Sequence, residues 1–238
     1  MITHIQLGDM TVEVDLKNIK NIHLSVYPPT GRVRISAPAR MDLDAIRVYA
    51  ISKLEWIKDQ QRKFRAQERE TPREYLERES HYLWGKRYLL HIVESNAVPF
   101  IDLSHTYLCL NVRPGADEGK KRDVIDAWYR SQLRQAAQPL IEKWEVIMGV
   151  KVEKVFLQRM KTRWGSCNPQ RQNIRLNTEL AKKPRECLEY IVVHELAHLI
   201  EPTHNARFVA LMNRYLPHWK QLRDELNRAP LGHVEWEY

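Results

Sequence analysis

Three histidines and one glutamate near the end of the chain have the spacing of a metal site. In the segment HELAHLIEPTH, His194 and His198 stand four residues apart, which on a helix places both imidazoles on one face, one turn apart. Two such imidazoles can bind the same metal ion, and His204 would supply a third nitrogen. Glu195 follows the first histidine and is of the residue type that takes a proton from a metal-bound water. The segment therefore predicts a hydrolytic metal centre.

Zinc is the metal that three neutral imidazoles favour, and we expect one ion per chain. Zinc takes tetrahedral nitrogen ligands and keeps one position open for water in catalytic sites. In a structural site a further Cys or His would fill that position, and Cys167 or Cys187 could serve in principle. A structural site, however, does not need a glutamate at the second position of the motif. Structural zinc stays an alternative, as do three unrelated histidines on a core-facing helix.

The helix that must carry the motif has recognisable ends. Pro184 suits the first helical position, where its missing N–H would have no partner anyway. Pro202 disfavours helical geometry in the residue before it, so the helix should end at Glu201. Asn205 is a good N-cap for a second helix. His204 would thus be held between a helix end and a helix start.

Glu195 interrupts an otherwise apolar stripe of this helix. The stripe consists of Leu188, Ile191, Val192 and Leu199, which repeat at helical spacing. Burying a carboxylate and two imidazoles there without partners would be unfavourable by roughly several kcal/mol. A divalent metal ion would remove that penalty.

The whole chain reads as α+β. The expected elements are two β-hairpins over residues 1–40, one helix over 43–67, a hairpin over 81–93, a strand over 106–112, a long amphipathic helix over 118–148, and strands over 152–160 and 174–177. These elements suggest a β-rich N-terminal region with one long helix, residues 1–115, and a metal-binding catalytic domain, residues 116–238.

The charge and composition limit the class of protein. The 238 residues include 38 Lys and Arg against 30 Asp and Glu, a net charge of +8. Such an excess favours an anionic partner, so nucleic acid bound through a basic surface is one interpretation and a solvated basic surface is the other. No apolar run could span a membrane and no signal peptide is recognisable, so we expect a cytoplasmic protein without a membrane partner. The sequence gives no indication of the oligomeric state.

Several segments of the chain resemble one known family. KTRWGSC, NIRLN, ELAKKP, EYIVVHELAHLIEPTHNARF and YLPHW together are similar to the YgjP-like zinc metallopeptidases, relatives of the SprT-like proteins and more distantly of other zincins. The resemblance covers most of the chain and is most specific over residues 159–226. It implies a zincin-like core in which the HExxH helix packs on a small antiparallel sheet with an edge strand at the cleft. It also implies Glu195 as the general base and, as zinc ligands, His194, His198 and His204.

The metzincin pattern HExxHxxGxxH has the same histidine spacing but differs at one position. Glu201 stands where that pattern has Gly. The turn between the last two histidines must therefore be built in another way, and the biology of metzincins does not carry over.

Hydrolysis of this kind also needs a group that stabilises the charge of the intermediate. Arg159, Lys161 and Arg163 alternate, so on a strand they would form a cationic row on one face, beside which a substrate backbone could add as a further strand. Tyr190 and His218 are the other candidates for contacting the intermediate or orienting the site.

The leading interpretation is a zinc-dependent hydrolase, a metallopeptidase that uses a Glu-activated zinc-bound water on a polypeptide substrate. One alternative is a metal-dependent nucleoside triphosphate pyrophosphatase on the same scaffold, which the basic residues favour and the lack of a glycine-rich phosphate-binding loop disfavours. A second alternative is a nucleic-acid-associated protein with a SprT-like protease role or a structural zinc.

Overall fold

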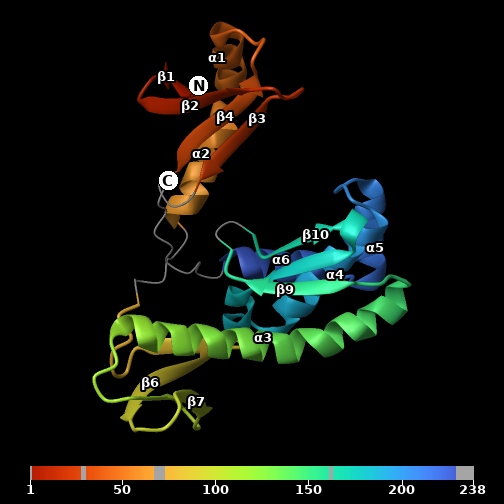
Figure 1. Cartoon of the computed structure of the whole chain (residues 1–238). Coiled ribbons are helices and arrows are strands. Elements are labelled where there is room, and N and C mark those ends of the chain that lie inside the picture. Colours follow the sequence, from red (N-terminus) through yellow and green to blue (C-terminus); the bar gives the residue numbers. More distant parts are fainter. Residues whose placement is uncertain (1, 28–30, 67–72, 161–162, 229–238) are drawn as a thin grey trace. The chain divides into compact units, whose positions relative to one another are not determined.

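A computed structural model describes residues 2–27, 31–66, 73–160 and 163–228 of the chain (Figure 1). The chain divides into two compact units, residues 1–68 and 69–238. The sequence suggested a division near residue 115 instead. The observed division comes earlier because residues such as Leu90, Leu108 and Leu110 belong to the hydrophobic core of the second unit.

The first unit is a four-stranded sheet with two helices. Its elements are β1 (Ile2–Leu7), β2 (Met10–Lys17), β3 (His23–Tyr27), β4 (Arg32–Pro38), α1 (Leu43–Ser52) and α2 (Leu54–Ala66). The strand order is β1-β2-β4-β3, with antiparallel outer pairs and a parallel central pair. Both predicted hairpins are confirmed. Val12, Val14 and Ile35 lie in the core of this unit.

The single helix predicted over residues 43–67 is wrong in one respect. The helix is interrupted at Lys53, which caps α1 before α2 starts. The Lys53 N–H donates to the Ala50 carbonyl three residues earlier, 3.1 Å away, so the last turn tightens and the regular helical hydrogen bonding stops.

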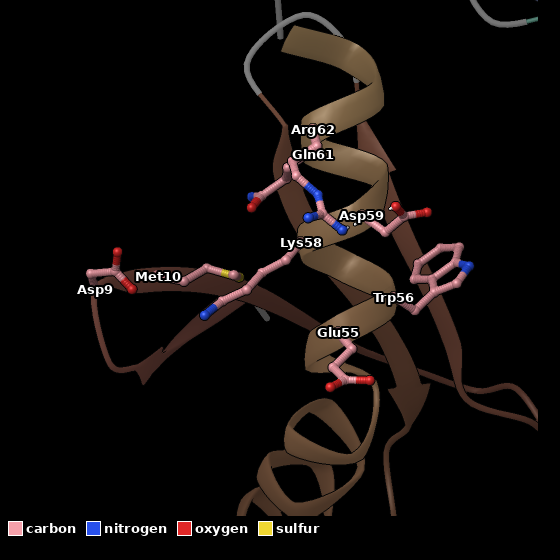
Figure 2. Close-up of a pocket in the computed structure, with 8 residues that line it drawn as sticks. All are labelled: Asp9, Met10, Glu55, Trp56, Lys58, Asp59, Gln61 and Arg62. Carbon is pink, nitrogen blue, oxygen red and sulfur yellow. Dashed lines mark hydrogen bonds and ion pairs between the residues drawn. The ribbon is translucent and has the colours of Figure 1, made fainter. Parts of the chain in front are cut away.

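A surface hollow of about 850 Å³ lies in the first unit (Figure 2). Its lining carries charges of both signs, and Arg62 forms an ion pair with Asp59 at 3.3 Å. The lining residues are Asp9, Met10, Glu55, Trp56, Lys58, Asp59, Gln61 and Arg62. None of them belongs to the histidine motif.

The second unit begins with another four-stranded sheet and a long helix. The sheet consists of β5 (Ser80–Leu83), β6 (Lys86–Glu94), β7 (Phe100–Leu103) and β8 (Tyr107–Val112), in the order β5-β6-β8-β7. Sequence patterns missed β7, which is only four residues long and partly exposed. The helix α3 (Glu118–Met148) confirms the prediction over 118–148. It begins at an Asp117 cap that accepts from the Lys120 N–H at 2.8 Å and ends at Gly149 with φ of 67°.

The motif helix lies in the last part of the chain. The elements there are β9 (Lys154–Gln158), β10 (Gly165–Asn168), η1 (Pro169–Arg171), β11 (Asn173–Asn177), η2 (Thr178–Lys182), α4 (Arg185–Ile200), α5 (Ala206–Tyr215) and α6 (Trp219–Arg228). The helix α4, which contains the HExxH residues, contacts β10, β11, α3, α5 and α6. This arrangement confirms the expected α+β fold.

The small sheet beside α4 has the order β10-β11-β9. The strand β10 is antiparallel to β11, whereas β11 is parallel to β9, so the sheet is mixed and not antiparallel throughout as expected. In this sheet β10 is an edge strand, with β11 as its only neighbour among the described strands. None of the described helices has the length and apolar character needed to cross a membrane.

Candidate metal centre

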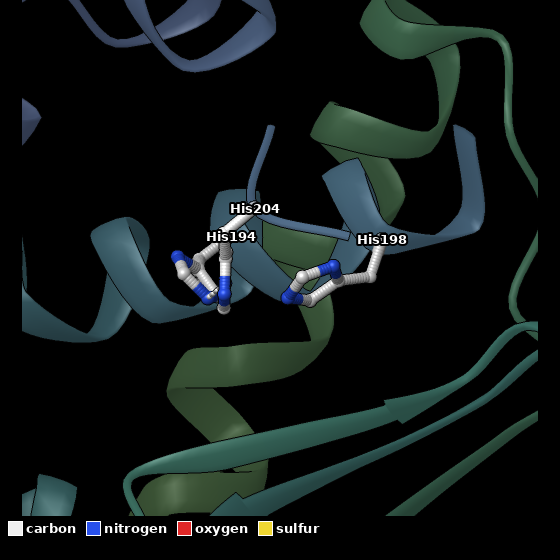
Figure 3. A group of neighbouring side chains, drawn as sticks. All are labelled: His194, His198 and His204. Carbon is white, nitrogen blue, oxygen red and sulfur yellow. Dashed lines mark hydrogen bonds between the residues drawn. The ribbon is translucent and has the colours of Figure 1, made fainter. Parts of the chain in front are cut away.

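The structure brings the three histidines of the motif together (Figure 3). His194 and His198 project from α4, and His204 reaches back from the turn that follows this helix. One ring nitrogen from each lies within 4.8 Å of the others. The Nε2 atoms of His194 and His204 are 3.1 Å apart. Two nitrogens bound tetrahedrally to zinc at 2.0–2.1 Å would be about 3.3 Å apart, so the cluster has dimensions close to those of a zinc site.

The turn between His198 and His204 explains how Glu201 can stand at a position where metzincins have Gly. Glu201 caps α4 with an extended backbone, φ of −136° and ψ of 102°, which any residue can adopt. Its carboxylate accepts hydrogen bonds from the Thr203 hydroxyl at 2.8 Å and the Thr203 N–H at 3.3 Å. The turn is therefore stabilised by a side chain, and no left-handed residue is needed.

The same turn favours one tautomer of His198. The Glu201 carbonyl oxygen lies 3.2 Å from Nδ1 of His198, which can donate to it. With the proton on Nδ1, the Nε2 lone pair of His198 is available to a metal ion. Such a backbone partner is a common feature of histidines that bind metals.

Burial keeps the histidines of α4 neutral. Desolvation, followed by the neighbouring His198 and His204, lowers the pKa of His194 to about 3, and desolvation also lowers the pKa of His198. Neutral imidazole is the form that binds metal. The two rings can therefore accept a cation without first losing a proton at neutral pH.

Glu195 is a buried carboxylate without a complete set of partners. Its side chain is only 4% exposed, and its Oε2 atom has no hydrogen-bond partner among the described residues. Burial raises the pKa of Glu195 to about 8, and the positive charge of Arg163 acts in the opposite direction. A cation held by the adjacent histidines would favour the ionised carboxylate. The donor set and this unsatisfied carboxyl oxygen fit a zinc ion.

Phe208, on α5, contacts all three imidazoles, and we did not identify it as a site residue from the sequence. Its ring centroid lies 5.0 Å from that of His194 and 4.7 Å from those of His198 and His204. The side chain is 2% exposed. The predicted cap at Asn205 is confirmed, since its side chain accepts from the Phe208 N–H at 3.0 Å. The sequence signal that could have identified Phe208 as a neighbour of the histidines was its position four residues after His204, at the start of a capped helix.

The predicted cationic row on a strand is wrong, because β9 ends at Gln158. Arg159 pairs instead with Glu179, with 3.7 Å between Nε and Oε1. Lys161 lies outside the described residues. Arg163 is exposed and near enough to Glu195 to act on its carboxylate, in opposition to burial. Of the two described residues of the row, Arg163 is thus the one that the structure brings near Glu195.

Tyr190 and His218 have different surroundings. Tyr190 lies one turn before His194, and their rings meet edge to face with centroids 5.8 Å apart. The Tyr190 ring also stacks on that of Trp219, with centroids 6.4 Å apart, and burial raises the pKa of Tyr190 to about 12. His218 is exposed in the turn before α6, close enough to Glu189 for an electrostatic interaction. Tyr190 therefore packs against the histidine cluster as a neutral phenol.

Comparisons with known proteins give one family and two similar structures. The family model of the YgjP-like metallopeptidase domain matches residues 20–229. The metallopeptidase zymogen abylysin of Pyrococcus abyssi shares 24% identity over 38% of this chain and 90% of its own, with a TM-score of 0.36. The metallopeptidase zymogen jannalysin of Methanocaldococcus jannaschii shares 18% identity over 38% of this chain and 92% of its own, with a TM-score of 0.35. A search of curated proteins found no match.

Proposed function

Because the chain belongs to the YgjP-like metallopeptidase family, we propose that it is a zinc-dependent peptidase in which Glu195 is the general base. One observation carries this proposal. Three imidazole nitrogens within 4.8 Å of one another lie beside a buried carboxylate whose Oε2 has no partner among the described residues. A purely structural zinc site would have no use for such a carboxylate.

The zinc ligands in this proposal are His194, His198 and His204. One ion per chain follows from the single three-residue cluster found among the described residues. Zinc at this position would act as a Lewis acid, which makes water more acidic and polarises a carbonyl group.

Glu195 would move the proton in the reaction. Its carboxylate takes a proton from the attacking water as oxygen adds to the peptide carbonyl carbon, and returns it to the leaving nitrogen when the C–N bond breaks. Burial suits both steps, because a carboxylate removed from water accepts a proton more readily than an exposed one, while a cation held by the three histidines would keep it ionised before the reaction.

The substrate backbone would bind beside β10. This strand is an edge of its sheet and begins at Gly165, next to α4, so its outer backbone groups can pair with an extended polypeptide. Arg163 precedes this edge and acts on Glu195, which makes it our candidate for stabilising the negative charge of the intermediate. Since β9 ends at Gln158, before the basic residues, we assign the substrate edge to β10.

The proposal is tested by comparing two variants of α4. Glu195→Gln removes the base and keeps the shape, whereas Glu186→Gln changes an exposed carboxylate on the first turn of the same helix. We expect Glu195→Gln to retain one zinc per chain and to lose at least about 100-fold of its turnover of an unfolded polypeptide. Glu186→Gln should match the wild type.

Substrate class is decided in the same experiment with a panel of nucleoside triphosphates. Hydrolysis of polypeptide that depends on Glu195 supports the peptidase. Hydrolysis of triphosphates alone would overturn it in favour of the pyrophosphatase alternative, and a fully active Glu195→Gln variant would overturn the role of the base.

A further inference from the structure

Gly165, the first residue of β10, faces the side chain of Glu195. A Cβ atom at this position would lie 2.9 Å from both Cγ and Cδ of Glu195 and closer still to Oε1. Cβ atoms in proteins essentially never approach other heavy atoms to less than 3.0 Å. The backbone of residue 165 therefore occupies the space into which a side chain would project, directly against the general base.

The backbone conformation at position 165 does not require a glycine. The described glycines with positive φ are Gly8, Gly31, Gly85, Gly115 and Gly149, and Gly165 is not one of them. It pairs with Leu176 in an ordinary antiparallel register. Any residue could adopt this conformation, so the requirement at position 165 is for space.

Glu195 also interacts with a second residue on the same face of β10. Side chains two residues apart on a strand point to one side, so Cys167 projects as a side chain at Gly165 would. Burial, followed by the Glu195 carboxylate, raises the pKa of Cys167 to about 12. The face of β10 that includes Gly165 and Cys167 is therefore the face turned toward Glu195.

The backbone on each side of this contact is held in place by other interactions. On one side, Asn177 holds the entry to β10, since its backbone N–H donates to the Trp164 carbonyl at 2.9 Å and its side-chain amide donates to the Arg163 carbonyl at 2.8 Å. On the other side, Glu195 lies between Leu196 and the half-buried His194 in a helix packed in the core. A side chain at position 165 would thus displace the carboxylate more easily than either backbone.

We propose that Gly165 is a positioning residue for the general base, because the missing side chain leaves the space that the Glu195 carboxylate occupies beside the three histidines. The inference about catalysis rests on the proposed peptidase function. The steric part does not, so the two can fail separately.

The steric part is tested by a double-mutant cycle read out as thermal stability. Gly165→Ala should lower the midpoint of thermal unfolding by about 5 °C when Glu195 is present. In the Glu195→Ala background the colliding atoms are gone, so the same substitution should lower it by less than about 1 °C. Equal losses in the two backgrounds would overturn the proposal.

Gly119→Ala is the matched control for this cycle. Gly119 lies in α3, and a Cβ there would lie an ordinary 3.4 Å from Oδ1 of Asp117. Its effect on stability should be the same with and without Glu195.

The catalytic part is tested by kinetics and zinc content. Gly165→Ala should keep one zinc per chain and lose at least about 10-fold in kcat with little change in KM, because the base is displaced and the histidines are not. Gly119→Ala should leave zinc content, kcat and KM unchanged. A wild-type kcat, or a loss confined to KM or zinc content, would overturn the positioning role. If the wild type hydrolyses no polypeptide, the proposed function fails. The double-mutant cycle in thermal stability still tests the steric contact between residue 165 and the Glu195 side chain.

Discussion

The Nε2 atoms of His194 and His204 lie 3.1 Å apart, although His194 is within α4 and His204 lies in the turn between α4 and α5. The turn between them is held by its own side chains. Glu201 accepts from Thr203, and the Asn205 amide donates to the Thr203 hydroxyl at 3.1 Å. These local hydrogen bonds shape the turn from which His204 points toward α4.

Removing His204 should weaken zinc binding more than it weakens the fold. Because His204 is exposed, His204→Ala leaves little unfilled space in the core. It removes one of three proposed ligands, so we expect the zinc dissociation constant to rise by at least about 100-fold, as measured by competition with a chromophoric chelator. His218→Ala serves as the control and should bind zinc as the wild type does. A His204→Ala variant with unchanged affinity would remove this residue from the ligand set.

Phe208 should contribute to zinc affinity through the orientation of the imidazoles. Phe208→Leu keeps an apolar side chain in the core but loses the ring that contacts all three histidines. We expect the zinc dissociation constant to rise by about 10-fold, because misdirected ligands bind more weakly. Met212→Leu, a buried change on the same helix, tests whether loss of packing alone has this effect. Equal zinc affinities of the two variants would contradict the orienting role.

Asn177 should stabilise the segment that leads into β10. Its amide nitrogen donates to the carbonyls of Met160 and Arg163, both at 2.8 Å, and its side-chain oxygen accepts from the N–H groups of Met160 and Glu179, both at 3.2 Å. Asn177→Ala leaves these backbone groups without their partner, so we expect the free energy of unfolding to fall by about 3 kcal/mol, measured by urea denaturation.

A control for Asn177→Ala lies on the same strand. The side-chain oxygen of Asn173 has no hydrogen-bond partner among the described residues, so Asn173→Ala should lower the free energy of unfolding far less. Similar losses for the two variants would show that Asn177 has no special role.

The sequence was sufficient to predict the site wherever local chemistry determined the structure. Pro202 and Asn205 set the end of α4 and the start of α5, and the four-residue histidine spacing set one helix face. The two long-range contacts of the site were not predictable in this way. Phe208 and Gly165 look like an ordinary core residue and an ordinary turn residue, and their roles depend on which atoms of α4 they face.

The wrong prediction of a cationic row on a strand has a similar cause. Alternation of Arg159, Lys161 and Arg163 satisfies the two-residue period of a strand, yet β9 ends at Gln158. The pairing of Arg159 with Glu179 and the hydrogen bonds from Asn177 to Met160 and Arg163 take the chain away from the sheet. These partners come from residues 177–179, and a periodic pattern contains no information about them.

His81 should make the stability of the second unit depend on pH. His81 lies on β5 and is 0% exposed. Burial lowers the pKa of His81 to about 3, and the positive charges of Arg73 and Lys182 act in the same direction. The Glu79 carboxylate lies 3.5 Å from Nε2 of His81, and the Tyr75 ring packs beside the imidazole. A base whose pKa is lowered by folding contributes stability above its unfolded pKa of 6.5 and loses it as the pH falls toward 3.

Replacing His81 by Phe should therefore remove one component of acid destabilisation. Between pH 6 and pH 4 the unfolded chain binds a proton at His81 that the folded chain does not, which corresponds to a slope of about 1.4 kcal/mol per pH unit in the free energy of unfolding. Urea denaturation across this range should show a slope shallower by about this amount in His81→Phe. Tyr82→Phe, which changes an exposed neighbour on the same strand and keeps His81, should retain the wild-type slope. Parallel profiles for wild type and His81→Phe would mean that His81 is protonated in the folded protein, with Glu79 as its counter-ion.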